Sequence, residues 1–226
     1  MSEFLGFTDR PPGAALRARH GLAPSVLVGG MAAVRLVRSL GAQEERVDLI
    51  AALRRDEPRL VPLSRAALSE AHIVAIMRRN SARIAADLAR LTGLIEVVVT
   101  LTYPRPTLKR EASGGIRYLA DRADERRSAR ALSQRAFDHL AALAAAAQGA
   151  HGQQIVPFLA GADLALLVEE ARVGGLRAEL ARHARQLIPG GGGARCAVTG
   201  PFPPFSFVTP LDQEEEITDV VRNAGA

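Results

Sequence analysis

The stretch Leu94-Ile-Glu-Val-Val-Val-Thr-Leu-Thr-Tyr103 has the density of β-branched residues that is typical of a central strand, and Pro104 ends it. Hydrophobic spacing after this stretch predicts four further elements: a helix over residues 115–148, a hairpin over 153–168, a helix over 174–188 and a strand over 194–199. The resulting order, β-α-β-β-α-β, is that of ferredoxin-like units. We therefore expect an α+β protein in which residues 93–210 form a ferredoxin-like C-terminal domain.

The chain before this strand predicts a second small α+β unit with its own sheet. Its elements follow from periodicity and from Gly and Pro signals: a strand over 3–8, a hairpin over 25–37 that turns at Gly29-Gly30, a helix over 43–55, a strand over 60–63 and a helix over 69–91. We place the N-terminal domain at residues 1–92. The acidic stretch 211–226 is expected to be a flexible tail.

Charge and hydropathy give no sign of a nucleic-acid or membrane partner. The net charge is +5, and the basic residues are dispersed among acids on predicted helices, as in Arg54-Arg-Asp-Glu57, which we interpret as a solvated face. No apolar run reaches the roughly 20 residues that span a bilayer, and the N-terminus lacks the pattern of a signal peptide. We expect a cytoplasmic protein that binds neither nucleic acid nor membrane.

Residues that could carry chemistry are scattered. None of the five histidines has metal-ligand spacing to another or to the single cysteine, Cys196, which we expect to be buried in its strand. The run Gly190–Gly193 leads from a helix into a strand, whereas a phosphate-binding loop leads from a strand into a helix. Glu96 has no second acid beside it. The sequence therefore predicts no catalytic site, metal site or cofactor.

One segment near the C-terminus is rich in proline and aromatic residues: Val198-Thr-Gly-Pro-Phe-Pro-Pro-Phe-Ser-Phe-Val208. Proline fixes φ and lacks an amide donor, so we expect a stiff, extended segment. Three of the seven Phe residues lie within it, which indicates either a packing element or a recognition surface. The candidate partner-binding residues are Gly200, Pro201, Phe202, Pro203, Pro204, Phe205 and Phe207.

This segment resembles the Gly-Pro-Trp-Pro-Pro-Tyr-x-Phe signature of the gas vesicle protein GvpF/GvpL family, with Phe202 and Phe205 in place of Trp and Tyr. Weaker matches occur upstream in the same order, at Leu60-Val-Pro-Leu63, Gly93-Leu-Ile-Glu96 and Gly115-Ile-Arg-Tyr-Leu119. The chain departs from the family pattern at Pro62-Leu-Ser-Arg-Ala66, where the usual sequence is Pro-Leu-Arg-Phe-Gly, at Val97 in place of an aromatic residue, and in lacking a family histidine.

The resemblance implies two α+β units, the second a modified ferredoxin fold. It implies an accessory or minor component of gas vesicles, which are cytoplasmic organelles, that contacts the major shell protein GvpA and other accessory proteins during assembly. It implies no enzymatic activity. Our hypothesis is that the aromatic residues Phe202, Phe205 and Phe207 hold the shell protein. Two alternatives remain from the residues alone: a small-molecule enzyme on a ferredoxin-like scaffold, and a nucleic-acid-binding module.

Overall fold

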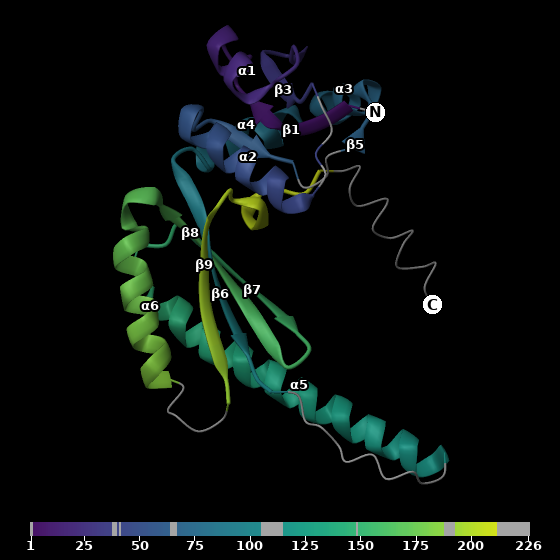
Figure 1. Ribbon diagram of the computed structural model, residues 1–226, viewed down its shortest axis with the longest axis vertical. Coiled ribbons are helices and arrows are strands. Elements are labelled where there is room, and N and C mark those ends of the chain that lie inside the picture. The colour runs from purple at the N-terminus through teal and green to yellow at the C-terminus, as the bar shows by residue number, and fades with distance from the viewer. Residues whose placement is uncertain are drawn as a thin grey trace. The chain divides into compact units, whose positions relative to one another are not determined.

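A computed structural model of the chain describes residues 2–37, 40, 42–63, 67–104, 115–147, 149–187 and 193–211 (Figure 1). The chain forms two compact units, one made of residues 1–95 together with 202–226 and the other of residues 96–201. In this division the described residues 202–211 lie with the first unit, whereas the sequence predicts a C-terminal domain over residues 93–210. Of the predicted tail, only Leu211 lies within the described residues, and its side chain is buried.

The first unit is built on an antiparallel sheet. Its strands are β1 (Ser2–Thr8), β2 (Val26–Val28), β3 (Met31–Arg35) and β4 (Leu60–Pro62), in the order β2-β3-β1-β4, and β5 (Ala67–Leu68) pairs with β1. The predicted strands and hairpin are confirmed, whereas β5 was not foreseen. Gly6 allows close approach of two strands, because a Cβ atom at this position would lie 2.3 Å from the carbonyl oxygen of Val61.

Four helices accompany this sheet: α1 (Ala14–His20), α2 (Gln43–Asp56), α3 (Glu70–Arg79) and α4 (Ser81–Arg90). The sequence predicted neither α1 nor the division between α3 and α4, which it treated as one helix. That helix is interrupted at Asn80, whose buried side-chain amide donates to the carbonyl of Ile76 at 3.0 Å and competes with the helix backbone. Ser69 caps α3, as its position predicts, by accepting from the amide of His72 at 3.2 Å.

Two buried arginines on α2 hold backbone carbonyls of the first unit. Arg46 donates from Nη2 to the carbonyl oxygens of Phe4, at 3.1 Å, and Leu63, at 2.6 Å. Arg54 donates to the carbonyl oxygens of Leu60, Leu91 and Leu94. Burial lowers the pKa of both guanidinium groups, that of Arg54 to about 10. The interpretation of Arg54 as part of a solvated face is wrong, because its side chain is buried and its guanidinium bonds three backbone carbonyls.

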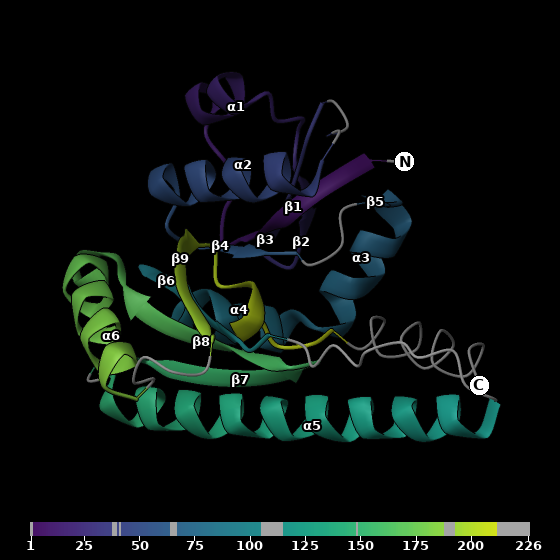
Figure 2. The same cartoon turned by 60° about the horizontal axis from the view of Figure 1, so that its bottom comes forward.

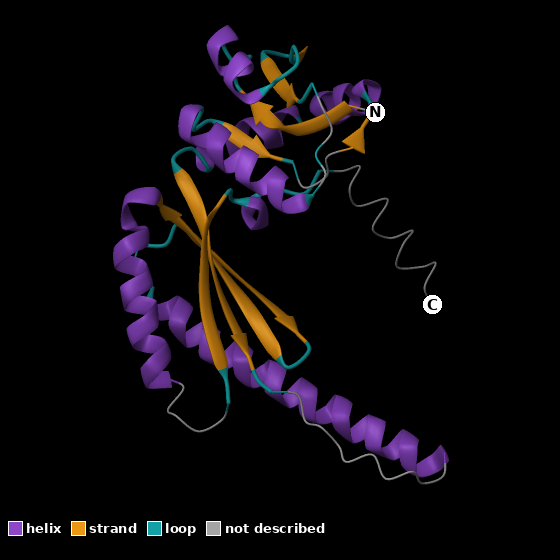
Figure 3. Cartoon of the chain, viewed as in Figure 1, coloured by secondary structure: helices purple, strands orange, loops and turns teal. Residues whose placement is uncertain are grey.

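The second unit follows the predicted β-α-β-β-α-β order. Its elements are β6 (Leu94–Thr102), α5 (Gly115–Ala146), β7 (Gly152–Phe158), β8 (Gly161–Glu169), a short 3-10 helix η1 (Glu170–Arg172), α6 (Val173–Leu187) and β9 (Arg195–Phe202). The four strands, orange in Figure 3, have the order β7-β8-β6-β9. The mixed α+β class is therefore confirmed. Residues 105–114 lie outside the described residues, as does the run Gly190–Gly193 except for Gly193.

Helix α5 packs against β7 and β8 and continues beyond the sheet at its N-terminal end (Figures 1 and 2). Its buried side chains form one apolar stripe between residues 129 and 144: Ala129, Ala136, Leu140, Leu143 and Ala144. In the first half, Tyr118 and Leu119 are exposed.

Strands β7 and β9 are the two edges of the second sheet. The expectation that Cys196 is buried is wrong, because β9 is an edge strand and leaves this side chain exposed. The hairpin between β7 and β8 turns at residues 159–160 with register Phe158↔Gly161. Gly161 has no room for a side chain, since a Cβ atom would lie 2.4 Å from the Phe158 ring and 2.6 Å from the carbonyl oxygen of Leu101.

Candidate functional site

The proline-aromatic segment, residues 200–207, begins inside a strand. The predicted strand over 194–199 is longer than expected, because β9 runs on through Pro201 to Phe202. An edge strand tolerates proline, since the missing amide donor can face away from the ladder. Gly200 has a φ of 111°, in the region that favours glycine, and its carbonyl accepts from the guanidinium of Arg177 on α6. The start of the segment is thus held within the second unit.

After β9 the segment is no longer extended. Residues Phe205–Phe207 form a turn of 3-10 helix, η2, so the prediction of an extended backbone throughout is wrong. Pro203 and Pro204 are buried. Phe205 packs against a buried apolar cluster of the first unit, formed by Leu5, Leu22, Val34, Leu36, Ile50, Leu53 and Leu60. The packing interpretation therefore holds for Phe205, and partial burial of this apolar side chain favours the turn.

The other two aromatic residues are partly exposed, as is Phe205, which is itself half-buried. Phe202 and Phe207 are both half-buried, so each presents part of its ring to solvent, and Ser206 between them is exposed. The backbone at Phe207 is fixed, because its carbonyl oxygen accepts from Nη2 of Arg90 at 2.5 Å. The segment therefore carries three partly exposed rings on a restrained backbone, and one of them, Phe205, packs against the apolar cluster.

Three charged residues of helix α4, Arg83, Asp87 and Arg90, bond the chain around Thr209. We call these three residues the polar clamp. Asp87, which is 2% exposed, accepts from the Thr209 amide at 2.7 Å through Oδ2 and from the Thr209 hydroxyl at 3.0 Å through Oδ1. Arg90 donates to Oδ1 of Asp87 at 2.6 Å, and Arg83 donates to the carbonyl of Pro210 at 3.3 Å. Charge-assisted bonds of this kind are stronger than neutral ones. The clamp fixes the chain on either side of Thr209.

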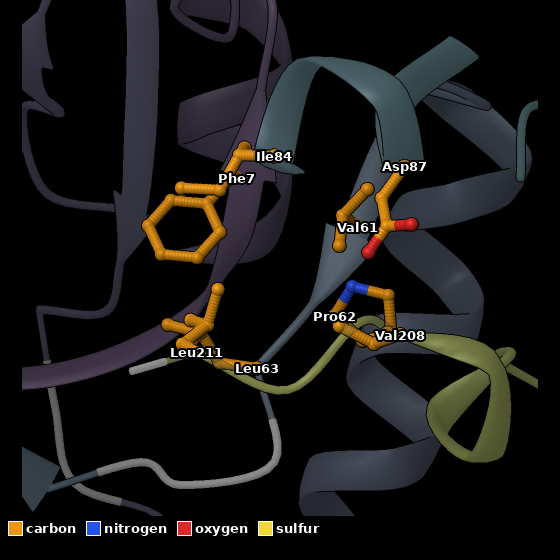
Figure 4. Close-up of a pocket in the computed structure, with 8 residues that line it drawn as sticks. All are labelled: Phe7, Val61, Pro62, Leu63, Ile84, Asp87, Val208 and Leu211. Atoms are coloured by element: carbon orange, nitrogen blue, oxygen red, sulfur yellow. The ribbon is translucent and has the colours of Figure 1, made fainter. Parts of the chain in front are cut away.

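Close to this clamp is a small apolar cavity (Figure 4). It is lined by Phe7, Val61, Pro62, Leu63, Ile84, Asp87, Val208 and Leu211. Its volume is about 10 Å³, which is close to the smallest space that holds one water molecule. The cavity is therefore a small packing gap inside the first unit, between its C-terminal segment and the rest of that unit, and it has no room for an organic ligand.

The histidines occupy separate places in the fold. His20 bonds Asp56 at 2.8 Å, His139 bonds the Tyr103 hydroxyl at 3.0 Å, and His151 lies 3.5 Å from Glu169. Within the described ranges, no three His, Cys, Asp or Glu side chains gather as metal ligands would. Glu96 is buried in β6 and has an interaction partner.

The sequence analysis missed the clamp. Arg83, Asp87 and Arg90 have the spacing i, i+4 and i+7, which places them on one helix face. That spacing was visible in the sequence. A charged face on a helix is normally interpreted as solvent-exposed, and nothing local indicates that a segment more than a hundred residues later covers it.

Comparisons with known proteins agree with the resemblance. The model of the family described as gas vesicle synthesis protein GvpL/GvpF matches residues 49–209, which include the proline-aromatic segment. No significant match to a curated protein sequence was found. No helix in the described part of the chain is long and apolar enough to cross a membrane.

Two solved structures share the fold. One is the crystal structure of the gas vesicle protein GvpF from Anabaena sp. PCC7120, with a TM-score of 0.59 and 13% identity over 93% of this chain and 97% of that one. The other is GvpF from Microcystis aeruginosa, with a TM-score of 0.59 and 12% identity over 92% of this chain and 99% of that one. Because the family model matches well over half of the sequence, the chain belongs to the gas vesicle GvpL/GvpF family.

Proposed function

We propose that this protein is a non-enzymatic accessory or minor structural protein of gas vesicles that binds the major shell protein GvpA and supports assembly of the vesicle. Family membership over residues 49–209 is the observation that carries this proposal. The proposal places the protein at the gas vesicle, together with other accessory proteins and without nucleic-acid or membrane partners. It also treats the second unit as the predicted ferredoxin-like domain.

The candidate contact with the shell protein is the proline-aromatic segment. A shell subunit that awaits polymerisation exposes apolar surface, and aromatic rings on a restrained backbone bind such surface at a low cost in conformational entropy. Arg90 and the Asp87–Thr209 bonds supply the restraint, and the half-buried rings of Phe202 and Phe207 supply the surface. Within this proposal, Phe205 anchors the segment by its contact with the apolar cluster.

Co-purification of the full chain with GvpA tests the proposal. The informative variant is the double substitution Phe202→Ala with Phe207→Ala, because Phe205→Ala also removes packing on the core. Leu27→Ala is the matched control: Leu27 is an apolar residue of the first unit that is 62% exposed and lies outside the segment. We expect the wild type and the control to capture GvpA, and the double variant to lose capture while its circular dichroism and melting temperature stay close to those of the wild type.

The possible outcomes distinguish a wrong proposal for the function from a wrong proposal for the contact site. Normal capture by a folded double variant would remove the segment as the contact and leave the function in place. Failure of the wild type to capture GvpA or any other gas vesicle protein would contradict the function itself. Capture that disappears above moderate salt concentration would favour a charged contact over the apolar one proposed here.

A further inference from the structure

Strand β7 is an open edge of the second sheet. It lies at the end of the order β7-β8-β6-β9, and its seven residues pair with β8 from Gly152↔Leu167 to Phe158↔Gly161. An edge strand presents unpaired amide and carbonyl groups, which proteins usually protect with charged residues. The sequence of β7, Gly-Gln-Gln-Ile-Val-Pro-Phe, contains no charge. Pro157 removes one donor near the end, so residues 152–156 remain able to pair with another strand.

A groove runs between this edge and helix α5, which lies alongside β7 in Figure 2. It has a volume of about 370 Å³. One wall is a single face of α5, formed by Arg130, Ser133, Gln134 and Phe137 at the spacing i, i+3, i+4 and i+7, and Pro157 of β7 faces it. A groove beside an edge strand suits strand addition, in which backbone hydrogen bonds give affinity and side-chain pockets give specificity.

Apolar side chains are exposed on the face of the hairpin opposite the groove, because side chains alternate along β7 and those of Val156 and Phe158 lie on the other side from Pro157. A strand added at this edge would lie beside both faces. Val156 is 50% exposed, Phe158 37% and Leu159 52%, and the chain from Gly152 to Ala162 contains no charged residue. Large exposed apolar side chains that are contiguous on one hairpin indicate an interaction surface, whereas scattered ones do not. The exposed side chains and the open backbone edge therefore favour the same kind of partner, an extended apolar segment.

The charge of the groove lining indicates which kind of extended apolar segment would bind there. Asp138 accepts a hydrogen bond from the neutral amide of Gln134 at 2.9 Å, and further along α5 Asp124 and Glu125 pair with Arg127 and Arg122. Among the described residues that line the groove itself, none has an acidic side chain. Arg130 is exposed and contributes a positive charge to the lining. A carboxylate on the partner would complement it. We propose that the groove between β7 and α5 binds an extended, mainly apolar peptide segment with an acidic side chain, which adds to the second sheet as a strand beside residues 152–156.

Synthetic peptides test this proposal on the full chain. The probe is the fluorescein-labelled peptide Val-Thr-Glu-Thr-Val-Thr amide, which places Val and Glu on the same face when it forms a strand. The control peptide is identical except that Lys replaces Glu. We expect the Glu peptide to bind about threefold more tightly than the Lys peptide, as for an exposed ion pair. Hydrogen exchange should show slower exchange within residues 152–156 when the Glu peptide is bound. A backbone N-methylated Glu peptide should not bind.

Charge-reversal variants locate the contact. Arg130→Glu should reverse the preference, so that the Lys peptide binds more tightly. Arg182→Glu, an equal change of charge at an exposed position on α6, should leave the preference unchanged. The proposal is overturned by absence of binding at millimolar peptide, by binding of the N-methylated peptide, or by binding without protection of residues 152–156. Self-association of the protein that protects these amides in the absence of peptide would assign the edge to a second copy and would also overturn it.

Discussion

The two units of this protein differ in which side chains they bury: the first unit buries polar side chains, and the second exposes apolar ones. Of the six buried polar or charged residues in the described part of the chain, five lie in the first unit, among them Arg46, Arg54 and Asp87. Of the seven large apolar side chains that are exposed there, five lie in the second unit, among them Val156 and Leu159. A buried polar group that is hydrogen-bonded fixes a unique arrangement, whereas exposed apolar surface is available for binding.

This contrast indicates that the two units have different roles. In the first unit, arginine and aspartate side chains from α2 and α4 bond distant backbone groups, including those of the C-terminal segment. In the second unit, the side chains of both edge strands, β7 and β9, and those of residues 118–128 of α5 are exposed or half-buried. We therefore expect substitutions at polar residues to damage the first unit most, and substitutions at tightly packed apolar positions to damage the second.

The largest effect should come from Arg54→Ala in the first unit. The substitution removes the buried donor that Arg54 supplies to the carbonyls of Leu60, Leu91 and Leu94, of which that of Leu91 still accepts from the Leu94 amide at 3.2 Å. We expect the free energy of unfolding to fall by about 3 kcal/mol, measured by urea denaturation. Arg55→Ala, at the exposed neighbouring position of α2, is the control and should change it by less than about 0.5 kcal/mol. Equal effects of the two substitutions would contradict the anchoring role of Arg54.

In the second unit, Gly161→Ala should destabilise by overpacking. The new methyl group would meet the Phe158 ring and the carbonyl oxygen of Leu101, and the backbone atom cannot move aside. We expect a loss of about 2 kcal/mol in the free energy of unfolding. Gly175→Ala on α6, where a Cβ atom meets nothing within 4 Å, should instead leave stability unchanged or raise it by roughly 0.5 kcal/mol. A stable Gly161→Ala protein would show that the hairpin packs more loosely than its geometry indicates.

A smaller effect is expected from Asp87→Asn, which tests whether the C-terminal segment belongs to the first unit. An asparagine amide cannot accept all the bonds that the carboxylate receives from Thr209 and Arg90. Stability should fall by about 1–2 kcal/mol, and the amide of Thr209 should exchange faster with solvent. Asp48→Asn, at an exposed position of α2, serves as the control. Unchanged exchange at Thr209 would show that the clamp does not hold the segment.

The smallest effect concerns the exposed carboxylate of Asp56. The hydrogen bond from His20 lowers the pKa of Asp56, with a further contribution from Arg19. A carboxyl group whose pKa is lowered in the folded state contributes stability above its unfolded pKa, near 4, and loses that contribution as the pH falls below it. We therefore expect the melting temperature of the wild type to drop more steeply than that of Asp56→Asn as the pH is lowered below about 4. Parallel curves would contradict this.

Much of the secondary structure could be predicted from local patterns. Three local patterns each predict one element, and all three predictions are confirmed. They are the dense β-branched run of β6, the Gly29-Gly30 turn and the hydrophobic spacing of α5. The break at Asn80 was missed because a side chain that bonds its own helix leaves the hydrophobic spacing unchanged. The burial of Arg54 was missed because its partners are backbone atoms from three other places in the chain.

By itself, the sequence determined the mixed α+β class, the order of elements in the second unit and the family, because periodicity and short motifs are local properties of the chain. Only the tertiary structure decided that residues after Pro201 join the first unit, that Asp87 clamps Thr209, and that Phe205 is an anchor while Cys196 is exposed. These features depend on contacts between residues far apart in the chain. Burial and hydrogen bonding across such distances leave no periodic signal, because each partner alone looks like an ordinary surface or core residue.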